Sequence, residues 1–406
     1  MAGHGPLSGY KVLDFTQFES GTVCTESLAW MGAEVWKIER PEKGELGRYS
    51  MSDPTHDCIG FSILNMNKKS LTLNLKSPEG IEICKKLVAE ADVLVENMSP
   101  GAIDRLGLGY EDCKKINPKL VFASIKGFAK GPYEKFPAFN PVAAAMGGLP
   151  ALNGEPDGMP YMIGISFADS GSGYMCAMAI LGALLQRERE GIGQKVDVSM
   201  TDTIIGFSRV SFEPYYMNNR IPPRRPGNGF PLEDIAPCDM YPTKGGGKND
   251  YVYIYTSRHP GAKQWDILCD VIGRPELKEA NDERMSTPAM RFKYKDVVTE
   301  AISSWTMQHD KMEAMEILCG AGVPTGAVRD IDDISRDDTH LESGLMAEID
   351  SVKGKIRVPG FVPRMSENTV EYENSPALGN ADEEIYKGLL GMTDEQFADF
   401  KAKKII

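Results

Sequence analysis

The first half of the chain alternates short, continuous apolar runs with longer segments whose apolar residues recur at helical spacing. Short apolar runs bounded by turn residues are typical of buried strands, and the longer segments are typical of helices. The expected strands are 10–15, 34–39, 71–75, 92–97 and 119–125. The expected helices include 21–33 and a helix that begins at Pro78 after the capping residue Ser77. This alternation predicts a parallel sheet, so we expect an α/β fold with a Rossmann-like large domain.

The pattern changes at 218–250, a segment dense in Pro, Gly and Asn that we expect to be mostly loop. A strand at 251–257 and helices near 261–272, 289–304 and 309–319 follow it, and they predict a smaller α/β domain. The C-terminal residues 381–404 are helical again. The expected organisation is a first part of the large domain, a linker, the small domain, and a return linker with the rest of the large domain, at 1–205, 206–230, 231–330 and 331–406.

Composition narrows the function classes. The formal charge of −13 comes from scattered acidic residues, which argues against nucleic acid or an anionic membrane as the main partner. The eight cysteines are widely separated and form no CxxC motif, so a reducing, cytoplasmic location fits best. The N-terminal segment has no signal-peptide pattern, and no long apolar run suggests a membrane span. No GxGxxG follows the first strand, so we do not expect NAD or FAD.

A single carboxylate, Asp169, lies between an apolar stretch and the small residues SGSG at the start of a long helical pattern. The local pattern is that of a helix N-cap. The same position fits a nucleophile, because the positive end of a helix favours the ionised carboxylate. The helical pattern ends at the stop signals Gly191 and Gly193, and a strand, QKVDVSM, follows.

These motifs together resemble the class III CoA-transferases, the CaiB/BaiF family that includes the formyl-CoA transferase and carnitine CoA-transferase type. The resemblance rests on ADSGSG, ALLQRE and GIGQKVDVSM, and on five earlier segments in the same order: KVLDFTQ, GAEVWKIERP, NMNKKSLTLNLKSPEG, DVLVENMSPGAIDRLGLGY and NPKLVFASIKGF. It is dense over about the first 200 residues and loose beyond them.

The resemblance implies a covalent mechanism. Asp169 matches the family nucleophile, which forms a mixed anhydride with the acyl group of the donor and then a thioester with CoA. Gln17 matches an active-site glutamine whose amide donates to developing oxyanions. The residues that the resemblance assigns to CoA binding are Arg40, Lys76, Asn97, Arg105 and Lys126.

The implied substrates are acyl-CoA and a carboxylic acid, with no tightly bound cofactor and no metal. The five histidines (His4, His56, His259, His309 and His340) are not spaced as zinc ligands. Subunits of the family are rings that thread through each other, so the resemblance implies an interlocked homodimer. A heteromer with a paralogous subunit stays open.

Two departures from the family pattern bear on specificity. In place of the long glycine loop of the formyl-CoA transferases the chain has only Gly227–Asn228–Gly229, while Gly245–Gly247 predicts a hairpin turn. We therefore expect a larger acid than formate or oxalate, with succinyl-CoA as a candidate donor. Bulky side chains that could line its pocket are Phe207, Phe212, Tyr215, Tyr216, Met217 and Phe230.

The second departure concerns the α-methylacyl-CoA racemases, which share the fold and use a histidine base. Asn140 stands where that histidine would fall, and an amide cannot abstract a proton at neutral pH. A transferase is therefore expected. A racemase-like enzyme and a CoA-binding subunit of a two-subunit transferase are the alternatives.

Overall fold

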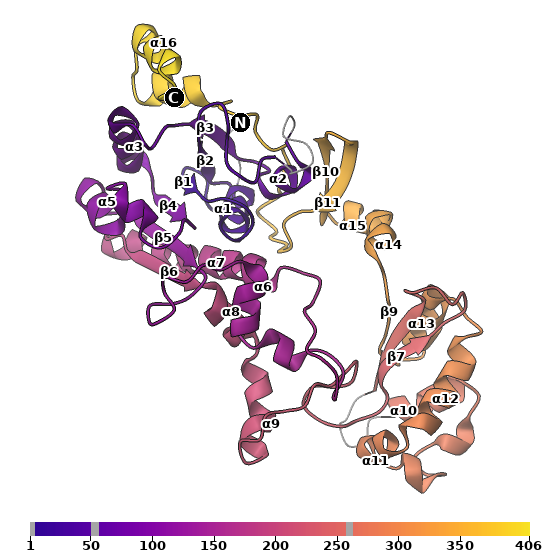
Figure 1. The fold of residues 1–406 in the computed structure, drawn as a ribbon. Coiled ribbons are helices and arrows are strands. Elements are labelled where there is room, and N and C mark those ends of the chain that lie inside the picture. The colour runs from indigo at the N-terminus through magenta and orange to yellow at the C-terminus, as the bar shows by residue number, and fades with distance from the viewer. Residues whose placement is uncertain (1–4, 50–56, 257–262) are drawn as a thin grey trace. The chain divides into compact units, whose positions relative to one another are not determined.

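The computed structural model describes residues 5–49, 57–256 and 263–406 (Figure 1). The chain forms two compact units. The large unit comprises Met1–Gly148, Gly164–Phe207 and Asp338–Ile406, and the small unit comprises Leu149–Ile163 and Ser208–Asp337. The chain therefore leaves the large unit and returns to it twice.

The large unit is built on a parallel sheet of six strands in the order β3-β2-β1-β4-β5-β6. This is the strand order of Rossmann folds, and it confirms the expected parallel α/β architecture. The strands are β1 (Lys11–Phe15), β2 (Glu34–Glu39), β3 (Lys69–Thr72), β4 (Val93–Glu96), β5 (Val121–Lys126) and β6 (Lys195–Ser199).

The third strand begins and ends earlier than the predicted 71–75. The Leu73 amide still donates to the Glu39 carbonyl of β2 (2.7 Å), and the next amide, that of Asn74, donates to the carbonyl of Ile405 (2.8 Å) in the C-terminal segment. This contact joins residues far apart in sequence, so the local apolar pattern could not indicate it.

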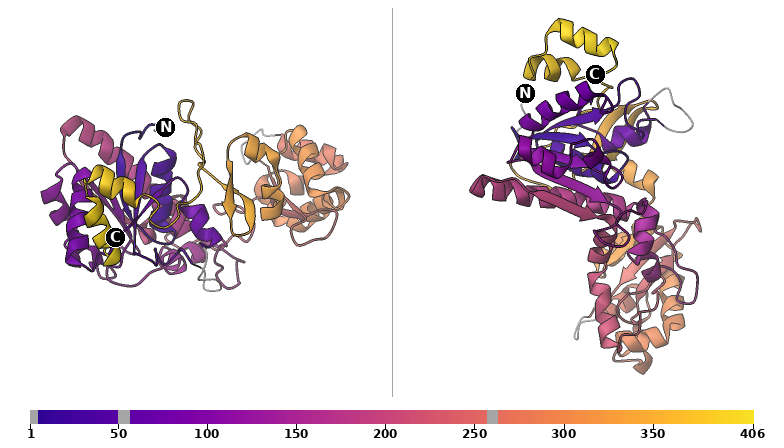
Figure 2. Two further views of the ribbon diagram at one scale, coloured as in Figure 1. Left: turned by 90° about the horizontal axis from the view of Figure 1, so that it is seen from above. Right: turned by 60° about the vertical axis from the view of Figure 1, so that its left-hand side comes forward.

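Helices cover both faces of the sheet (Figures 1 and 2). On one face α3 (Pro78–Glu90), α5 (Tyr110–Ile116) and the C-terminal residues share a core with β1 and β2. The C-terminal residues form a π-helical turn (Glu383–Leu389) and α16 (Asp394–Ala402), and Ile405 and Ile406 are buried. On the other face lie α1 (Ser20–Trp30) and α7 (Phe167–Glu190), which pack against each other.

The predicted start of α3 at Ser77 and the predicted end of α7 at Gly191 are confirmed. The hydroxyl of Ser77 accepts from the Gly80 amide (2.9 Å) at the start of α3. Gly191 adopts a positive φ of 74° at the end of α7, where glycine is favoured over residues with a side chain.

Shorter elements complete the large unit. They are α2 (Ile59–Leu64), α4 (Ala102–Arg105), α6 (Asn140–Met146), α8 (Met200–Phe207), α15 (Asp338–Glu342) and the hairpin of β10 (Met346–Ser351) with β11 (Gly354–Pro359). Helices α6 and α8 pack against α7.

The small unit has its own antiparallel sheet in the order β7-β8-β9, with strands Cys238–Pro242, Tyr251–Tyr255 and Thr325–Ala327. Its helices are α9 (Phe212–Met217), α10 (Gln264–Val271), α11 (Pro288–Lys293), α12 (Lys295–Thr306), α13 (Lys311–Gly320) and α14 (Ile331–Ser335). Gly245–Gly247 forms the turn between β7 and β8, as expected. Residue 257 of the predicted strand and 261–262 of the predicted helix lie outside the described residues.

By length and composition α7 would be long and apolar enough to cross a membrane, and it is the one described helix that is. Half of the qualifying stretch is buried inside the protein. Contacts with α1, β5 and β6 on the sheet give it the packing of a core helix.

Candidate active site

Most of the predicted site residues follow the carboxyl ends of strands in the large unit. Because the six strands are parallel, these ends form one edge of the sheet, where ligands bind in open α/β folds. In sheet order the residues at this edge are Lys76 after β3, Arg40 after β2, Gln17 after β1, Asn97 after β4 and Lys126 at the end of β5. The connections from β1 and β4 leave for opposite faces of the sheet, so Gln17 and Asn97 lie at the point where ligands bind in this fold.

The loop between β1 and α1, residues 16–19, is held by the side chain of Asn97. The amide of Gln17 donates to Asn97 Oδ1 (2.9 Å), and Asn97 Nδ2 donates to the Gln17 carbonyl (2.8 Å) and to Ser20 Oγ (3.1 Å). Phe18 follows with a positive φ of 61°, a backbone angle that residues other than glycine rarely adopt. The Asn97 contacts use the Gln17 backbone and leave its side-chain amide without a hydrogen bond to any described residue.

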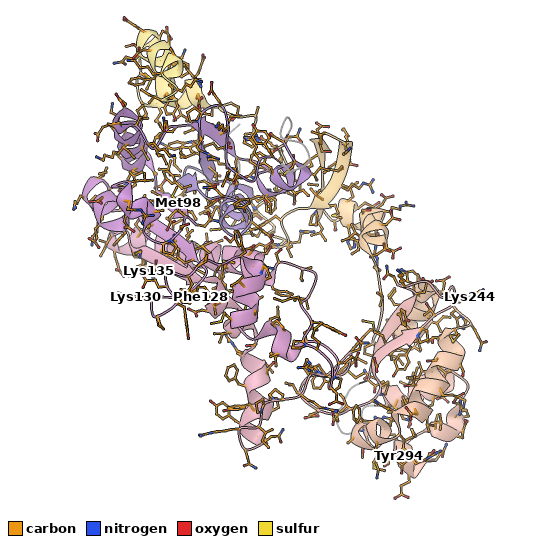
Figure 3. The ribbon with its side chains drawn as sticks, in the orientation of Figure 1. Met98, Phe128, Lys130, Lys135, Lys244 and Tyr294 are labelled. Carbon is orange, nitrogen blue, oxygen red and sulfur yellow. The ribbon has the colours of Figure 1, made fainter. Side chains whose placement is uncertain are left out.

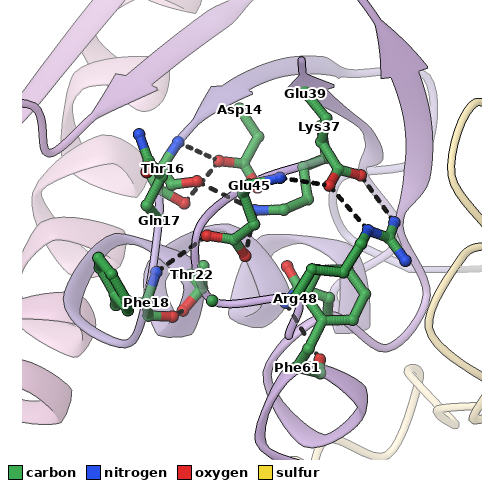
Figure 4. Close-up of polar contacts among 12 residues, drawn as sticks. Asp14, Thr16, Gln17, Phe18, Thr22, Lys37, Glu39, Glu45, Arg48 and Phe61 are labelled. Atoms are coloured by element: carbon green, nitrogen blue, oxygen red, sulfur yellow. Dashed lines mark hydrogen bonds and ion pairs between the residues drawn. The ribbon is translucent and has the colours of Figure 1, made fainter. Parts of the chain in front are cut away.

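A buried ionic network lies directly beneath this loop (Figure 4). Lys37 Nζ donates to the Thr16 carbonyl (3.0 Å) and pairs with Glu45 Oε1 (3.2 Å). The other oxygen of Glu45 accepts from the Phe18 amide (3.1 Å). Lys37 thus reaches the loop from β2, and Glu45 reaches it from the segment after β2. Buried charges are tolerated only when they are paired and hydrogen-bonded, so this network fixes the loop firmly.

The network extends through two further ion pairs. Lys68 Nζ lies 3.2 Å from Asp14 Oδ2, and Arg48 lies 2.8 Å from Glu39. Asp14 also accepts from Thr16 and Thr25. Although burial alone would raise the pKa of Asp14, Lys68 and Lys37 lower it below its usual value. Asp14 therefore stays ionised and holds the end of β1.

Asp169 lies in the first turn of α7, but it is not the N-cap residue. Ser166 occupies that position without a side-chain hydrogen bond, so the predicted capping role of Asp169 is wrong. The cap comes instead from Asn140, which begins α6. Its Oδ1 accepts from the backbone amides of Ala168 (2.9 Å) and Asp169 (3.3 Å). Because α7 leads back to the start of the parallel strand β6, its first turn lies at the carboxyl edge of the sheet.

The glycines of ADSGSG bring this turn close to α1 and α8. A Cβ on Gly173 would lie 2.6 Å from the Ser20 carbonyl oxygen and 2.9 Å from Val23 Cβ. A Cβ on Gly171 would lie 2.6 Å from the ring of Phe207, which also packs edge-on against Phe167. The small residues therefore allow close helix packing, with aromatic rings beside the turn that carries Asp169.

The electrostatics of Asp169 differ from the expected stabilisation by the helix end. Burial, and secondarily the negative charge of Glu19, raise its pKa to about 7. Among the described residues, the Asp169 carboxylate has no hydrogen-bond donor and no cationic partner. Loss of water around the carboxylate outweighs the favourable potential of the helix end. A carboxylate without partners, and more basic than usual, is suited to attack an electrophilic carbonyl.

The basic residues predicted to bind CoA differ in whether they already form ion pairs within the protein. Arg40, Lys76 and Arg105 are exposed, and within the described part of the chain none of them forms an ion pair. Lys126 is the last residue of β5, one position beyond the end of the predicted strand 119–125. Its ammonium group donates to Glu96 (2.7 Å) and to the Met98 carbonyl (2.6 Å). The first three are thus available to anionic oxygens of a ligand.

The loop after β5 adds features that the sequence analysis did not single out. The rings of Phe128, Tyr133 and Phe136 pack together with centroids 5.5 to 6.4 Å apart. Figure 3 shows Phe128, Lys130 and Lys135 in this region, and neither lysine has an ion-pair partner in the parts of the chain that the structure covers. The signal was present in the segment KGFAKGPYEKF, where lysines alternate with aromatic residues.

Two other groups were also missed. Asp14 and Lys37 are charged residues inside apolar strand patterns, which was a readable sign that each is buried with a partner of opposite charge. Glu19 near Asp169 carried no comparable sign. Three of the histidines (His4, His56 and His259) lie outside the described residues, and within those described no cluster of potential metal ligands is found.

Comparisons with known proteins agree with this architecture. Residues 7–382 match the family model described as CoA-transferase family III. The chain is 37% identical over 411 residues to formyl-CoA:oxalate CoA-transferase of Bradyrhizobium diazoefficiens, covering 97% of this chain and 95% of the relative. The enzyme of the same name from Rhodopseudomonas palustris shows the same identity and coverage.

The fold matches a solved structure as well. The crystal structure of a CaiB/BaiF family protein from Brucella suis superposes with a TM-score of 0.82 at 31% identity, covering 95% of this chain and all of the other. The resemblance inferred from the motifs is thereby confirmed across nearly the whole chain, including the second half where those motifs were sparse. This chain is a member of CoA-transferase family III, an enzyme that transfers CoA.

Proposed function

We propose that this enzyme moves CoA from an acyl-CoA to a carboxylic acid through covalent intermediates on Asp169. The observation that carries the proposal is the unpartnered Asp169 carboxylate in the first turn of α7, at the ligand-binding edge of the sheet. The rings of Phe167 and Phe207 pack edge-on against each other beside this turn and give that side of the site an apolar surface.

In the first half-reaction an Asp169 oxygen attacks the thioester carbonyl of the donor. The C–S bond breaks, CoA leaves as thiolate, and a mixed anhydride remains on Asp169. The thiolate then attacks the carbonyl carbon of Asp169, and the donor acid departs as a carboxylate. The product is an aspartyl-CoA thioester.

The second half-reaction reverses these steps with the acceptor. The acceptor carboxylate attacks the aspartyl thioester and expels CoA thiolate. The thiolate attacks the acceptor carbonyl of the new anhydride, which yields the product acyl-CoA and restores the Asp169 carboxylate. The side-chain amide of Gln17 is the proposed donor to the oxyanions of these steps.

CoA binding is assigned to the carboxyl edge. Arg40, Lys76 and Arg105 are the proposed partners of its phosphates, because each is exposed and free of ion pairs with described residues. Asn97 and Lys126 remain the proposed neighbours of the pantetheine arm. In the structure Asn97 holds the β1–α1 loop through the Gln17 backbone, and Lys126 donates to the Met98 carbonyl.

The acid pair is the finer part of the proposal. The names of the relatives favour formyl-CoA and oxalate. The short Gly227–Asn228–Gly229 segment and the ring of Phe207 beside Asp169's turn favour a larger acid, with succinyl-CoA as donor. Parallel assays with both donors, and with oxalate, succinate and an aryl-substituted acid as acceptors, distinguish these pairs.

The contacts of Asn140 argue against the racemase alternative. Its side chain caps α7 through backbone amides, and an amide supplies no base there.

For the assembly we propose the family's interlocked homodimer, working in the cytoplasm. The outward face of α7 exposes Tyr174, Met178 and Leu185, whose spacing places them along one side of the helix. An apolar stripe of this kind on a soluble family fold is suited to a protein partner. Mass spectrometry of the subunits in the purified enzyme distinguishes the homodimer, which contains one kind of chain, from a heteromer with a paralogous subunit, which contains two.

The first prediction tests the nucleophile. Asp169→Asn, which keeps size and removes the nucleophilic oxygen, should reduce transfer at least 1,000-fold (on the order of the loss of a covalent catalyst) while CoA still binds. Hydroxylamine added to wild-type enzyme with acyl-CoA should convert Asp169 to a hydroxamate, detectable by peptide mass spectrometry. Near-normal transfer by the Asn variant, or labelling on another residue, would rule out this mechanism.

A further inference from the structure

The charge of Glu19 acts on Asp169, but the proposed mechanism gives Glu19 no role. It precedes α1 at the carboxyl end of the β1 loop, and it is partly buried. Its position is set from both sides. The preceding amide, that of Phe18, donates to Glu45, while the Glu19 carbonyl accepts from Val23 N (2.9 Å) and Thr22 Oγ1 (2.8 Å).

The Glu19 side chain reaches across to α7. Ser170 Oγ donates to Glu19 Oε1 (2.6 Å), and Ser170 is the residue directly after Asp169. The approach is close because Gly173, one turn further along α7, places that helix against the Ser20 carbonyl. The carboxylate of Glu19 is thus anchored to the same helical turn as the proposed nucleophile.

Among the residues that the structure describes, no positive charge acts on Asp169 to balance this pair. From α6, Asn140 contributes a neutral amide oxygen to the backbone of Asp169. From α8, Phe207 contributes a ring beside Gly171. On α7 the next ionisable group is Tyr174, whose pKa is raised by burial and by the charges of Glu26 and Glu19. Among the described residues, Glu19 is therefore the charge that acts on Asp169.

We propose that Glu19 is a positioning residue whose carboxylate holds the first turn of α7 through Ser170 and places a fixed negative charge beside Asp169. This inference rests on the proposed function of Asp169. Two carboxylates in a site with little water resist full ionisation, so one of them binds its proton more tightly. Asp169 binds its proton more tightly than usual, because burial first, and the negative charge of Glu19 second, raise its pKa to about 7. The Ser170 hydroxyl donates its hydrogen bond to Glu19 and not to Asp169.

The arrangement has a direct catalytic consequence. A more basic carboxylate is a stronger nucleophile once ionised, but it is protonated at acid pH. The acid side of the kcat/KM profile of the free enzyme should therefore have its midpoint near the Asp169 pKa of about 7. Burial of Asp169 raises this midpoint most, and the charge of Glu19 raises it further.

The test is Glu19→Gln, which keeps an oxygen for Ser170 and removes the charge. The acid midpoint of kcat/KM should fall by roughly one pH unit, the usual size of an effect of one neighbouring charge. Below both midpoints the variant should then be up to about tenfold more active than wild type. Glu19→Asp, which retains the charge, should keep most of the wild-type displacement. Glu79→Gln, an exposed glutamate at the start of α3, is the matched control and should leave the midpoint in place.

A measurement without substrate separates this proposal from the mechanism itself. The carboxyl infrared band that disappears in Asp169→Asn reports protonation of Asp169 directly, and its titration midpoint should fall with that of kcat/KM in Glu19→Gln. If both midpoints stay unchanged, the role of Glu19 is refuted, and the labelling of Asp169 still decides whether it is the nucleophile. If Asp169→Asn transfers CoA normally, the proposed function fails, whatever Glu19 does to the infrared titration.

Discussion

At the scale of single residues, the described part of the large unit buries several ionisable side chains next to β1 and β2, and all but one of these form ion pairs. The exception is Glu26 of α1, which is 3% exposed and accepts a hydrogen bond from the Met66 amide at Oε1 (2.8 Å). Burial raises its pKa to about 8, although Lys68, that hydrogen bond and Lys37 each lower it. Glu26 is therefore mostly protonated at neutral pH, whereas Asp14 nearby is ionised.

A pH dependence of stability follows for Glu26. Between its pKa in the unfolded chain, near 4.5, and its folded value of about 8, the folded state holds a proton that the unfolded state has released. The free energy of unfolding should then decrease with rising pH by up to about 1.4 kcal/mol per pH unit from this group. Glu26→Gln, which can keep the Met66 hydrogen bond, should lose that contribution. Urea unfolding of both proteins at pH 5.5 and 8.5 checks it.

In this comparison the Gln variant should gain stability relative to wild type at pH 8.5. Glu82→Gln, an exposed position on α3, serves as the control and should leave the pH dependence unchanged. Equal pH dependence in wild type and Glu26→Gln would show that Glu26 is ionised in the folded protein.

Which residues could be predicted depended on how far their partners lie along the chain. Asp169, Arg40 and Arg105 were selected from the sequence because family motifs surround them, and their roles await experiment. The pairing of Asp14 with Lys68 and the contact of Glu19 with Ser170 join positions 54 and 151 residues apart. No local pattern encodes such distances, so both depended on knowledge of the fold.

At the scale of elements, β1, β2, β4 and β5 were the easiest to predict because each is a mostly apolar run buried on both faces of a parallel sheet. The start of α7 was harder. Its cap is the side chain of Asn140, which belongs to a different helix 28 residues earlier. The sequence therefore placed the helix start at Asp169, whereas the helix begins at Phe167.

The contact between α7 and α1 leads to a prediction about Gly173. Gly173→Ala should destabilise the protein by about 1 to 3 kcal/mol, because the added methyl group meets the Ser20 backbone, and overpacking of this kind is costly. The same substitution at Gly320, the last residue of α13, meets nothing within 4 Å and should be neutral or stabilising. Chemical denaturation of the two variants gives the comparison. A Gly173→Ala protein as stable as wild type would mean that the two helices can separate at little cost.

At the scale of the whole molecule, the proposed interlocked dimer predicts unusual dissociation behaviour. Two linked rings cannot separate without unfolding, so light scattering should show no folded species at the chain mass of 44.6 kDa, even at high dilution. Mixed tagged and untagged enzyme should form no hybrid dimers in native buffer, and should form them after unfolding and refolding together. Rapid exchange under native conditions, or a stable monomer, would contradict the linked arrangement.

The packing of the C-terminal residues against the α3 and α5 face sets an order of events during synthesis. Ile385 and Tyr386 complete the core of a sheet whose last strand, β6, ends at Ser199. The ribosome must therefore make the entire small unit while the part of this face that the C-terminal residues cover stays exposed, although α3 and α5 already cover the rest. At about 5 to 20 residues per second, the interval between residues 207 and 381 lasts roughly 9 to 35 s. During this interval the nascent chain exposes apolar surface to which chaperones can bind, and a chain that ended before residue 381 would keep that surface exposed.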